Sequence, residues 1–150
     1  MVNPNVIALG YADDQGGNWL RYTSKGLHSY WDNNGVKRAM TQAGVNTSQD
    51  YASAIIQNSP VVPQTTGAVT DWPKKWADEM LPYAAKAHKG FKFGPRNMVT
   101  NPQHPNDPPH PDWPVTKTPT GYSDWVRDTV DDRITTAGYR LAQILTAIWP

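Results

Sequence analysis

Residues 123–149, SDWVRDTVDDRITTAGYRLAQILTAIW, carry the strongest periodic pattern in this chain. Apolar residues recur there every three or four positions, at Val126, Val130, Ile134, Ala137, Leu141, Leu145 and Ile148. This spacing predicts a long α-helix with one apolar face, and Ser123 or Asp124 can cap it. Because Gly138 lowers helix stability relative to alanine, we expect another helix to pack closely there.

Three segments upstream also predict helices. Leu27–Met40 keeps one apolar stripe, although Asn33-Asn34-Gly35 weakens its middle. Ser48–Asn58 opens with a serine that can cap a helix. Asp71–Gly90 has one apolar face, and we expect a kink or a break at Pro82 because proline removes a helical hydrogen bond.

β structure is expected in one place, Asn18–Thr23 (NWLRYT), which is rich in aromatic and β-favouring residues. Phe91–Gly121 contains proline at a density that disfavours helix and central strand, so it predicts a long surface loop. The sequence therefore predicts a mainly α, multi-helix fold with one short β element near the N-terminus. We expect residues 1–150 to form a single domain, with residues 91–121 as a Pro-rich insertion.

Composition narrows the classes of function. The 150 residues carry a net charge of +1, so any nucleic-acid binding needs a local site rather than overall charge. The chain has no cysteine, which excludes disulfides, thiolate metal sites and a cysteine nucleophile. No segment approaches the roughly 20 apolar residues of a membrane span. Met1–Leu9 lacks the basic and apolar regions of a targeting signal, and the compartment stays open.

Two short motifs could carry chemistry. His28 and Asp32 are four residues apart in LHSYWD, so a helix would place both side chains on one face, where they could share a zinc ion or form a surface ion pair. Gly16-Gly17-Asn18 could let a ligand approach the backbone, or could be an ordinary turn. Arg140 is expected to pair with a carboxylate rather than to contact phosphate.

The order of these motifs resembles one known family. Gly16-Gly17-Asn18, a short strand, Leu27-His28-Ser29-x-Trp31-Asp32, then Trp76–Glu79 and finally Ala137–Ala142 (AGYRLA) are similar to the C-terminal half of the zinc-dependent single-strand nucleases, the S1/P1 nuclease family. The resemblance extends from about Gly10 to Trp149. It implies a mainly α-helical fold with three zinc ions at the base of a cleft.

The resemblance also implies an activity and a set of site residues. Family members hydrolyse phosphodiester bonds of single-stranded DNA and RNA, and many are 3′-nucleotidases. His28 and Asp32 match two ligands of one zinc, Asn18 matches the asparagine that contacts the base, and Gly16 and Gly17 line that pocket. Trp19, beside Asn18, is a further candidate for nucleotide contact, and no catalytic residue is expected beyond the metal ligands. The family is typically secreted or periplasmic, but no signal peptide is expected here.

The other zinc ligands of the family have no counterpart in Met1–Leu9 (MVNPNVIAL). We therefore expect an N-terminal half of the same enzyme as a partner that completes the cluster, beside the nucleic-acid substrate. Two alternatives remain open. The chain could be a catalytically silent fragment or helical interaction domain without the full cluster. It could also be a zinc-dependent phosphodiesterase of the phospholipase C kind, which shares the three-zinc helical architecture.

Overall fold

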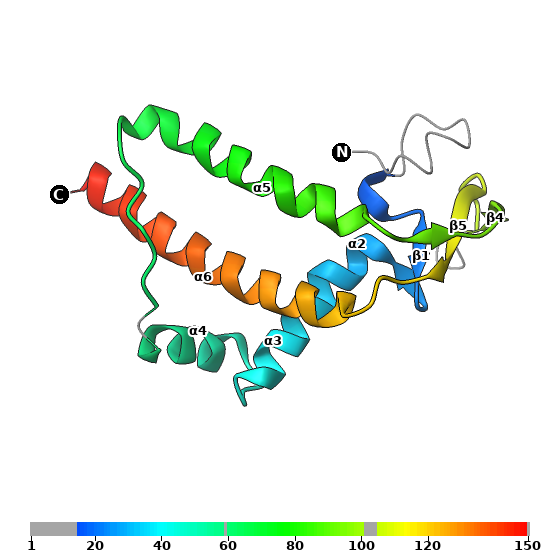
Figure 1. Cartoon of the computed structure of the whole chain (residues 1–150), viewed down its shortest axis with the longest axis horizontal. Helices are drawn as coiled ribbons and strands as arrows, with labels where there is room; N and C mark the ends of the chain where they lie inside the picture. The colour runs from blue at the N-terminus through cyan, green and yellow to red at the C-terminus, as the bar shows by residue number, and fades with distance from the viewer. Residues whose placement is uncertain (1–14, 59, 101–104, 150) are drawn as a thin grey trace. The chain divides into compact units, whose positions relative to one another are not determined.

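A computed structural model of the chain describes residues 15–58, 60–100 and 105–149 (Figure 1). Met1–Leu9, in which the sequence shows no targeting signal and no counterpart of the family's other zinc ligands, lies outside this part. The chain forms two compact units. The first comprises Met1–Asn34 and Ala84–Tyr122, and the second comprises Gly35–Tyr83 and Ser123–Pro150.

The first unit is built on a mixed sheet of five strands among the described residues. The strands are β1 (Leu20–Tyr22), β2 (Lys25–Gly26), β3 (Lys92–Phe93), β4 (Asn97–Val99) and β5 (His110–Lys117). Their order is β2-β1-β5-β3, and β4 also pairs with β5. β1 runs parallel to β5, and the other pairs are antiparallel.

The predicted mainly α fold is therefore wrong: the chain is rich in helix but also contains this mixed sheet. The expectation of a structureless loop at 91–121 is wrong as well, because three of the strands lie in it. Proline lacks an N–H but keeps its carbonyl acceptor. The Pro114 carbonyl accepts a hydrogen bond from the Gly94 amide at 2.8 Å. Trp113, which directly precedes Pro114, has an amide and donates it to the Trp19 carbonyl at 2.9 Å.

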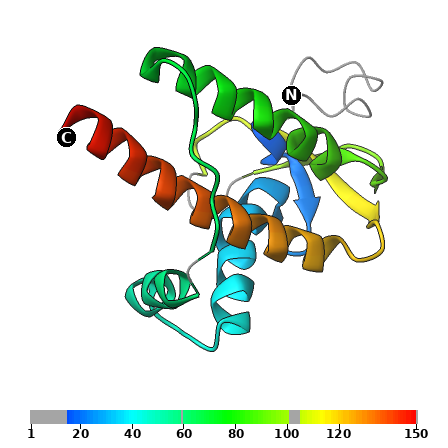
Figure 2. The ribbon, with the colours of Figure 1, turned by 60° about the vertical axis from the view of Figure 1, so that its left-hand side comes forward.

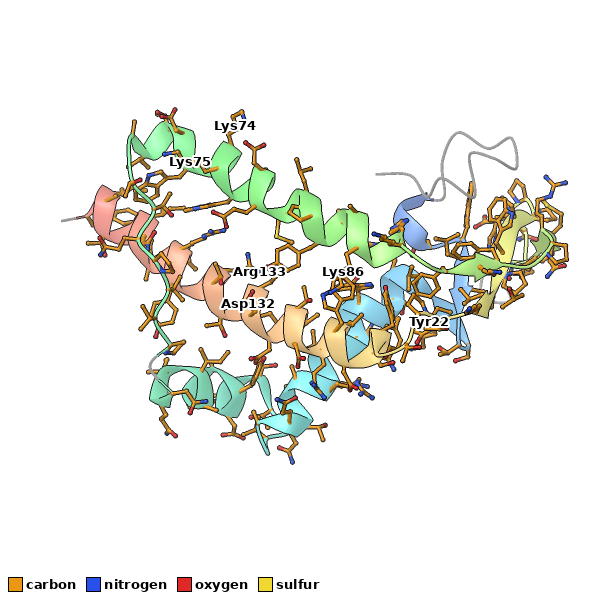
Figure 3. All side chains as sticks on the ribbon, in the orientation of Figure 1. Tyr22, Lys74, Lys75, Lys86, Asp132 and Arg133 are labelled. Atoms are coloured by element: carbon orange, nitrogen blue, oxygen red, sulfur yellow. The ribbon has the colours of Figure 1, made fainter. Side chains whose placement is uncertain are left out.

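Aromatic rings fill the core of the first unit. The Tyr22 ring, placed on β1 in Figure 3, lies edge-on to Tyr30 with ring centroids 4.6 Å apart. Phe91 and Tyr122 meet in the same way, also at 4.6 Å. The Tyr122 hydroxyl accepts from the Trp31 indole at 2.9 Å and donates to the Ala87 carbonyl at 3.0 Å. These contacts join the sheet to the short helical segments that follow β2.

A continuous helical run follows β2, as the sequence predicts. It comprises α2 (Leu27–Ser29), the π-helical turn η2 (Tyr30–Gly35) and α3 (Val36–Gln42). The π-helical turn includes the Asn33-Asn34-Gly35 segment that weakens the apolar stripe. Insertions of this kind are frequent at functional sites.

The second unit is helical. Its elements are α3, α4 (Ser48–Gln57), η3 (Val69–Asp71), most of α5 (Trp72–His88) and most of α6 (Tyr122–Ile148). Thr47 rather than Ser48 caps α4, since its hydroxyl accepts from the Asp50 amide at 3.1 Å. The predicted break at Pro82 is absent, because α5 continues through it. None of the described helices is both long enough and apolar enough to cross a membrane.

An extended strap, residues 60–68, crosses α6 on its way to α5 (Figures 1 and 2). The Trp76 indole donates to the Thr65 hydroxyl at 2.8 Å, and the Gln143 side chain accepts from the Thr65 amide at 3.2 Å. Lys75 donates to the Thr66 carbonyl at 2.6 Å. Side chains of both helices therefore hold the strap in place.

The close helix approach expected at Gly138 occurs at a different glycine. Among the described residues, no atom outside its own helix backbone lies within 4 Å of a Cβ added to Gly138. A Cβ on Gly35 would lie 2.9 Å from Val130 Cγ2 and 3.1 Å from Val126 Cγ1. Gly35, at the start of α3, is thus the position where a helix packs closely on α6.

Candidate metal and nucleotide site

The structure brings His28 and Asp32 together. His28 lies in α2 and Asp32 in the π-helical turn η2, and both side chains are about half exposed. His28 Nε2 lies 3.0 Å from Asp32 Oδ2. The predicted juxtaposition of the imidazole and the carboxylate thus holds through the change from α- to π-helical geometry.

A backbone carbonyl fixes the orientation of the imidazole. His28 Nδ1 lies 3.2 Å from the Gly16 carbonyl oxygen. That oxygen can only accept, so Nδ1 donates in this contact, while Nε2 faces the Asp32 carboxylate. Metal-binding histidines are commonly held in this way, with the second ring nitrogen donating to a carbonyl or carboxylate.

Gly16 and Gly17 pack directly against His28. Gly16 and Gly17 both have left-handed backbone angles, with φ of 63° and 92°, which glycine adopts at little cost. A Cβ on Gly17 would lie 3.5 Å from the His28 amide nitrogen. The glycines therefore let the chain turn beside His28 and present the Gly16 carbonyl to its ring.

Gly26 lies against the backbone of the same loop, a role that was not predicted from the sequence. A Cβ at this position would lie 2.6 Å from the backbone carbonyl oxygen of Asn18, too close for any other residue. The sequence feature that could have indicated this role is a glycine directly before Leu27. Its role depends on a contact with a residue eight positions earlier, which no local pattern records.

Asn18 and Trp19 complete the candidate site. Asn18 is exposed, and Trp19 is half-buried. The Trp19 ring lies 6.4 Å from that of Trp113, which is fully buried. Trp19 therefore packs against the sheet and keeps part of its surface exposed. The roles predicted for these two residues remain predictions.

The pair fits part of a zinc site. Two donors on one tetrahedral zinc, each about 2.0–2.1 Å from the ion, are separated by about 3.3 Å. The 3.0 Å between Nε2 and Oδ2 is near this value, and imidazole with carboxylate is a donor set that zinc accepts. Residues 15–58, 60–100 and 105–149 contain no group of three side chains suited to hold a metal. The described residues thus bring together two candidate donors, whereas catalytic zinc usually has three protein ligands.

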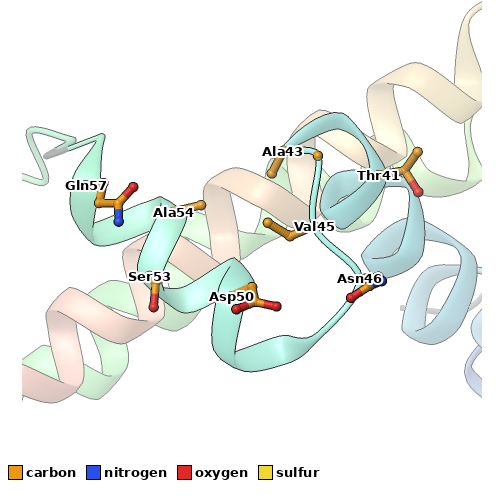
Figure 4. Close-up of a pocket in the computed structure, with 9 residues that line it drawn as sticks. Thr41, Ala43, Val45, Asn46, Asp50, Ser53, Ala54 and Gln57 are labelled. Atoms are coloured by element: carbon orange, nitrogen blue, oxygen red, sulfur yellow. The ribbon is translucent and has the colours of Figure 1, made fainter.

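Elsewhere in the part of the chain that the structure describes, charged and hollow regions show no comparable arrangement. Arg140 pairs with Glu79, which confirms the structural role expected for it. The pocket between α3 and α4, about 660 Å³, has Asp50 as its single ionisable residue (Figure 4). A second pocket of about 460 Å³ lies beneath the strap, where the Arg133 side chain stacks on Tyr83 at 4.9 Å. His28 and Asp32 therefore remain the best candidates for metal chemistry.

The family model described as S1/P1 Nuclease matches residues 8–150 of the chain. The match includes His28, Asp32 and the Gly16–Asn18 segment. No curated protein and no solved structure matches the chain significantly.

Proposed function

Because the chain belongs to the S1/P1 nuclease family, we propose that it takes part in zinc-dependent hydrolysis of phosphodiester bonds in single-stranded DNA and RNA. Nuclease function, and with it the hydrolase class, follows from the family. The use of zinc, the single-stranded substrates and the site residues are our proposal. The orientation of His28 by the Gly16 carbonyl is the observation that carries it.

In this proposal, His28 Nε2 and Asp32 Oδ2 are two ligands of one zinc ion. Zinc supplies a nucleophile at neutral pH and neutralises charge on the phosphoryl oxygens. The Gly16 carbonyl keeps the proton on Nδ1, so that Nε2 stays available as a ligand. The negative charge of Asp32 offsets part of the charge of the ion.

The Gly16–Asn18 loop places the substrate in this proposal. Asn18 offers both a donor and an acceptor to the edge of a base, and it lies on the loop that touches His28. The positive φ angles of Gly16 and Gly17 fix the course of that loop. The same contacts therefore position the base-binding amide and the metal ligand, which favours a nucleotide over a lipid phosphodiester.

One observation favours a competing function. The described residues supply two donors and no third, as expected for a helical domain that lacks its own catalytic cluster. Zinc binding at the His28 ring and hydrolysis by the chain distinguish the two functions. The competing domain would show neither of them.

The test is a zinc titration followed by ¹⁵N spectra of the imidazole rings. With zinc, the His28 Nε2 signal should shift while that of His110, on β5, stays in place. Hydrolysis of single-stranded DNA should fall at least a hundredfold in His28→Ala and Asp32→Ala if the ion is lost with its ligand.

Asp78→Ala is the matched control. Asp78 pairs with Lys74 at i,i+4 on α5, at 2.6 Å, so its removal also breaks an exposed helical ion pair. We expect it to leave zinc binding and hydrolysis unchanged. A zinc response that persists in Asp32→Ala would overturn the assignment of these two ligands.

A further inference from the structure

The pocket beneath the strap is lined by charged side chains. It has a volume of about 460 Å³ and lies within the second unit. This volume is in the range of about 300–1,000 Å³ that is usual for small-molecule sites. The strap forms one wall, and side chains of α5 and α6 form the others. The ionisable residues of the lining are the cations Lys75, Arg133 and Arg140 and the anions Glu79 and Asp132, so positive charge is in excess.

The three cations lie around a single carboxylate. Arg140 Nη2 pairs with Glu79 Oε2, and Arg133 Nη1 lies 3.9 Å from the same oxygen. Lys75 precedes Glu79 by four residues, so the two side chains are neighbours on one face of α5. Asp132, the other anion, pairs with the adjacent Arg133 on α6 (Figure 3). Glu79 alone therefore cannot balance the charge of the cations around it.

The two arginines are the most buried charged groups of this pocket. The side chain of Arg140 is 15% exposed and that of Arg133 is 22% exposed. The carboxylates are more open, since the side chain of Glu79 is 48% exposed and that of Asp132 is 53% exposed. Solvent screens exposed charges more strongly than buried ones. An anion in the pocket would therefore gain more from the arginines than it would lose to the carboxylates.

Aromatic rings of α5 hold both guanidinium groups. Arg140 Cζ lies 5.1 Å from the centre of the Trp76 ring. Arg133 Cζ lies 4.9 Å from the centre of the Tyr83 ring. Contacts of this kind restrain a guanidinium group and leave its N–H donors for other partners. The cations are thus arranged before a ligand arrives, which lowers the entropy cost of binding.

The hydrogen-bonding capacity of Arg140 is not used up by Glu79. A guanidinium group has more N–H donors than one ion pair needs, and the pair with Glu79 involves Nη2. Arg140 Nε is buried and has no hydrogen-bond partner among the residues that the structure describes. Native proteins seldom leave a buried N–H group unpaired, because this costs free energy. The unpaired donor therefore points to a further acceptor at this guanidinium group.

We propose that the pocket beneath the strap binds a phosphate group, either as the free ion or as part of a small phosphomonoester. Arg133, Arg140 and Lys75 donate to its oxygens. Because these donors come from two helices, they fit a tetrahedral oxyanion that accepts on several sides better than a planar carboxylate. The inference does not depend on the proposed function, since His28 and Asp32 belong to the first unit.

The test is a calorimetric titration with inorganic phosphate at constant ionic strength, in EDTA so that no metal takes part. We expect a dissociation constant of about 1 mM. In ¹⁵N spectra the Arg140 Nε–H signal, assigned by its absence in Arg140→Lys, should shift with phosphate. That variant keeps the positive charge but loses the guanidinium group, and it should weaken binding about tenfold. Lys75→Gln, at an exposed residue, should weaken binding about threefold.

Glu79→Gln should change the affinity in the opposite direction. It removes a negative charge from the pocket and keeps an oxygen acceptor for Arg140. Phosphate should therefore bind about threefold more tightly. A cluster of arginines that only joins α5 to α6 would show no such gain.

Two further probes identify the ligand. Ribose 5-phosphate that binds more tightly than inorganic phosphate identifies a phosphomonoester, weaker binding identifies the free ion, and both results support the site. Acetate should bind about tenfold more weakly than phosphate. Acetate binding as tight as that of phosphate would overturn the proposal, since a carboxylate would then fit equally well.

Arg127→Lys is the matched control. Arg127 also lies on α6 and pairs with two carboxylates, Asp124 and Asp128, but it is not among the residues that line this pocket. The substitution should leave the affinity for phosphate unchanged. An equal loss of affinity in Arg127→Lys, or an Arg140 Nε–H signal that stays in place at about 20 mM phosphate, would overturn the proposal. Failure of the zinc assignment leaves this result untouched, because the measurement contains no metal.

Discussion

At the scale of single residues, the candidate site depends on the absence of a side chain at Gly26, which leaves room for the backbone of Asn18. Gly26→Ala would place a Cβ 2.6 Å from the Asn18 carbonyl oxygen. Because the nearest atom belongs to the backbone, the loop itself must move. We expect a loss of about 2 kcal/mol in the free energy of unfolding, measured by urea denaturation, and weaker binding of a mononucleotide.

Gly138→Ala should have the opposite effect on the free energy of unfolding. The added Cβ meets no atom within 4 Å among the described residues, apart from its own helix backbone. Alanine in place of glycine inside a helix should stabilise the chain by about 1 kcal/mol. If Gly26→Ala proved as neutral or as stabilising as Gly138→Ala, the close contact at Asn18 would be refuted.

Thr23 has a strained backbone conformation. It lies in the turn between β1 and β2 with φ of 60°, a region that β-branched residues avoid. We expect Thr23→Gly to raise stability by about 1 kcal/mol, which raises the melting temperature by about 2–4 °C in a chain of this size. Ser24→Gly, in the same turn at a residue without positive φ, should not raise it.

At the scale of secondary structure, periodicity in the sequence predicts the elements that are formed by contacts between residues close together in the chain. The apolar spacing of residues 123–149 predicted α6 closely, and the i,i+4 spacing of His28 and Asp32 predicted their contact. The strands of residues 91–121 were missed because their partners are distant in the chain. Trp113 pairs with Leu20, and no pattern around either residue records that pairing.

The same distinction applies to the candidate site. The two proposed ligands belong to one helical run and were found from sequence. The Gly16 carbonyl that orients His28 was not, although Gly16 had been singled out for its backbone freedom. A backbone carbonyl carries no residue-type signal, so its role appears only when the loop and the helix are placed together.

The contact between α3 and α6 yields a prediction for a pair of residues. Gly35→Ala should destabilise the chain by about 1–3 kcal/mol, because its Cβ would lie 2.9 Å from Val130 Cγ2. Val130→Ala, which leaves a cavity, should also be destabilising. In the double variant the new methyl group occupies part of that cavity, so the combined loss should be smaller than the sum of the two. Additive losses, measured by urea denaturation, would contradict this contact.

At the scale of the whole molecule, one tyrosine among the described residues of each unit has a pKa well above its ordinary value. In the first unit, burial is the main cause at Tyr122. In the second, burial and the hydrogen bond to Asp131 raise the pKa of Tyr51. Both phenols are therefore protonated in the folded chain at pH values where they ionise in the unfolded chain. The stabilisation is complete below about pH 10 and is lost as the pH rises further.

Alkaline unfolding should consequently report on both units. Above pH 10 the folded chain binds more protons than the unfolded chain, so the free energy of unfolding should fall by about 1.4 kcal/mol per pH unit for each of the two phenols. Urea denaturation between pH 8 and pH 11 measures this slope, and phenolate absorbance follows the ionisation. Tyr51→Phe and Tyr122→Phe should each remove one phenol's share, because phenylalanine does not titrate. If neither Tyr51→Phe nor Tyr122→Phe changed the slope, burial of these hydroxyls would not be the source of the pH dependence.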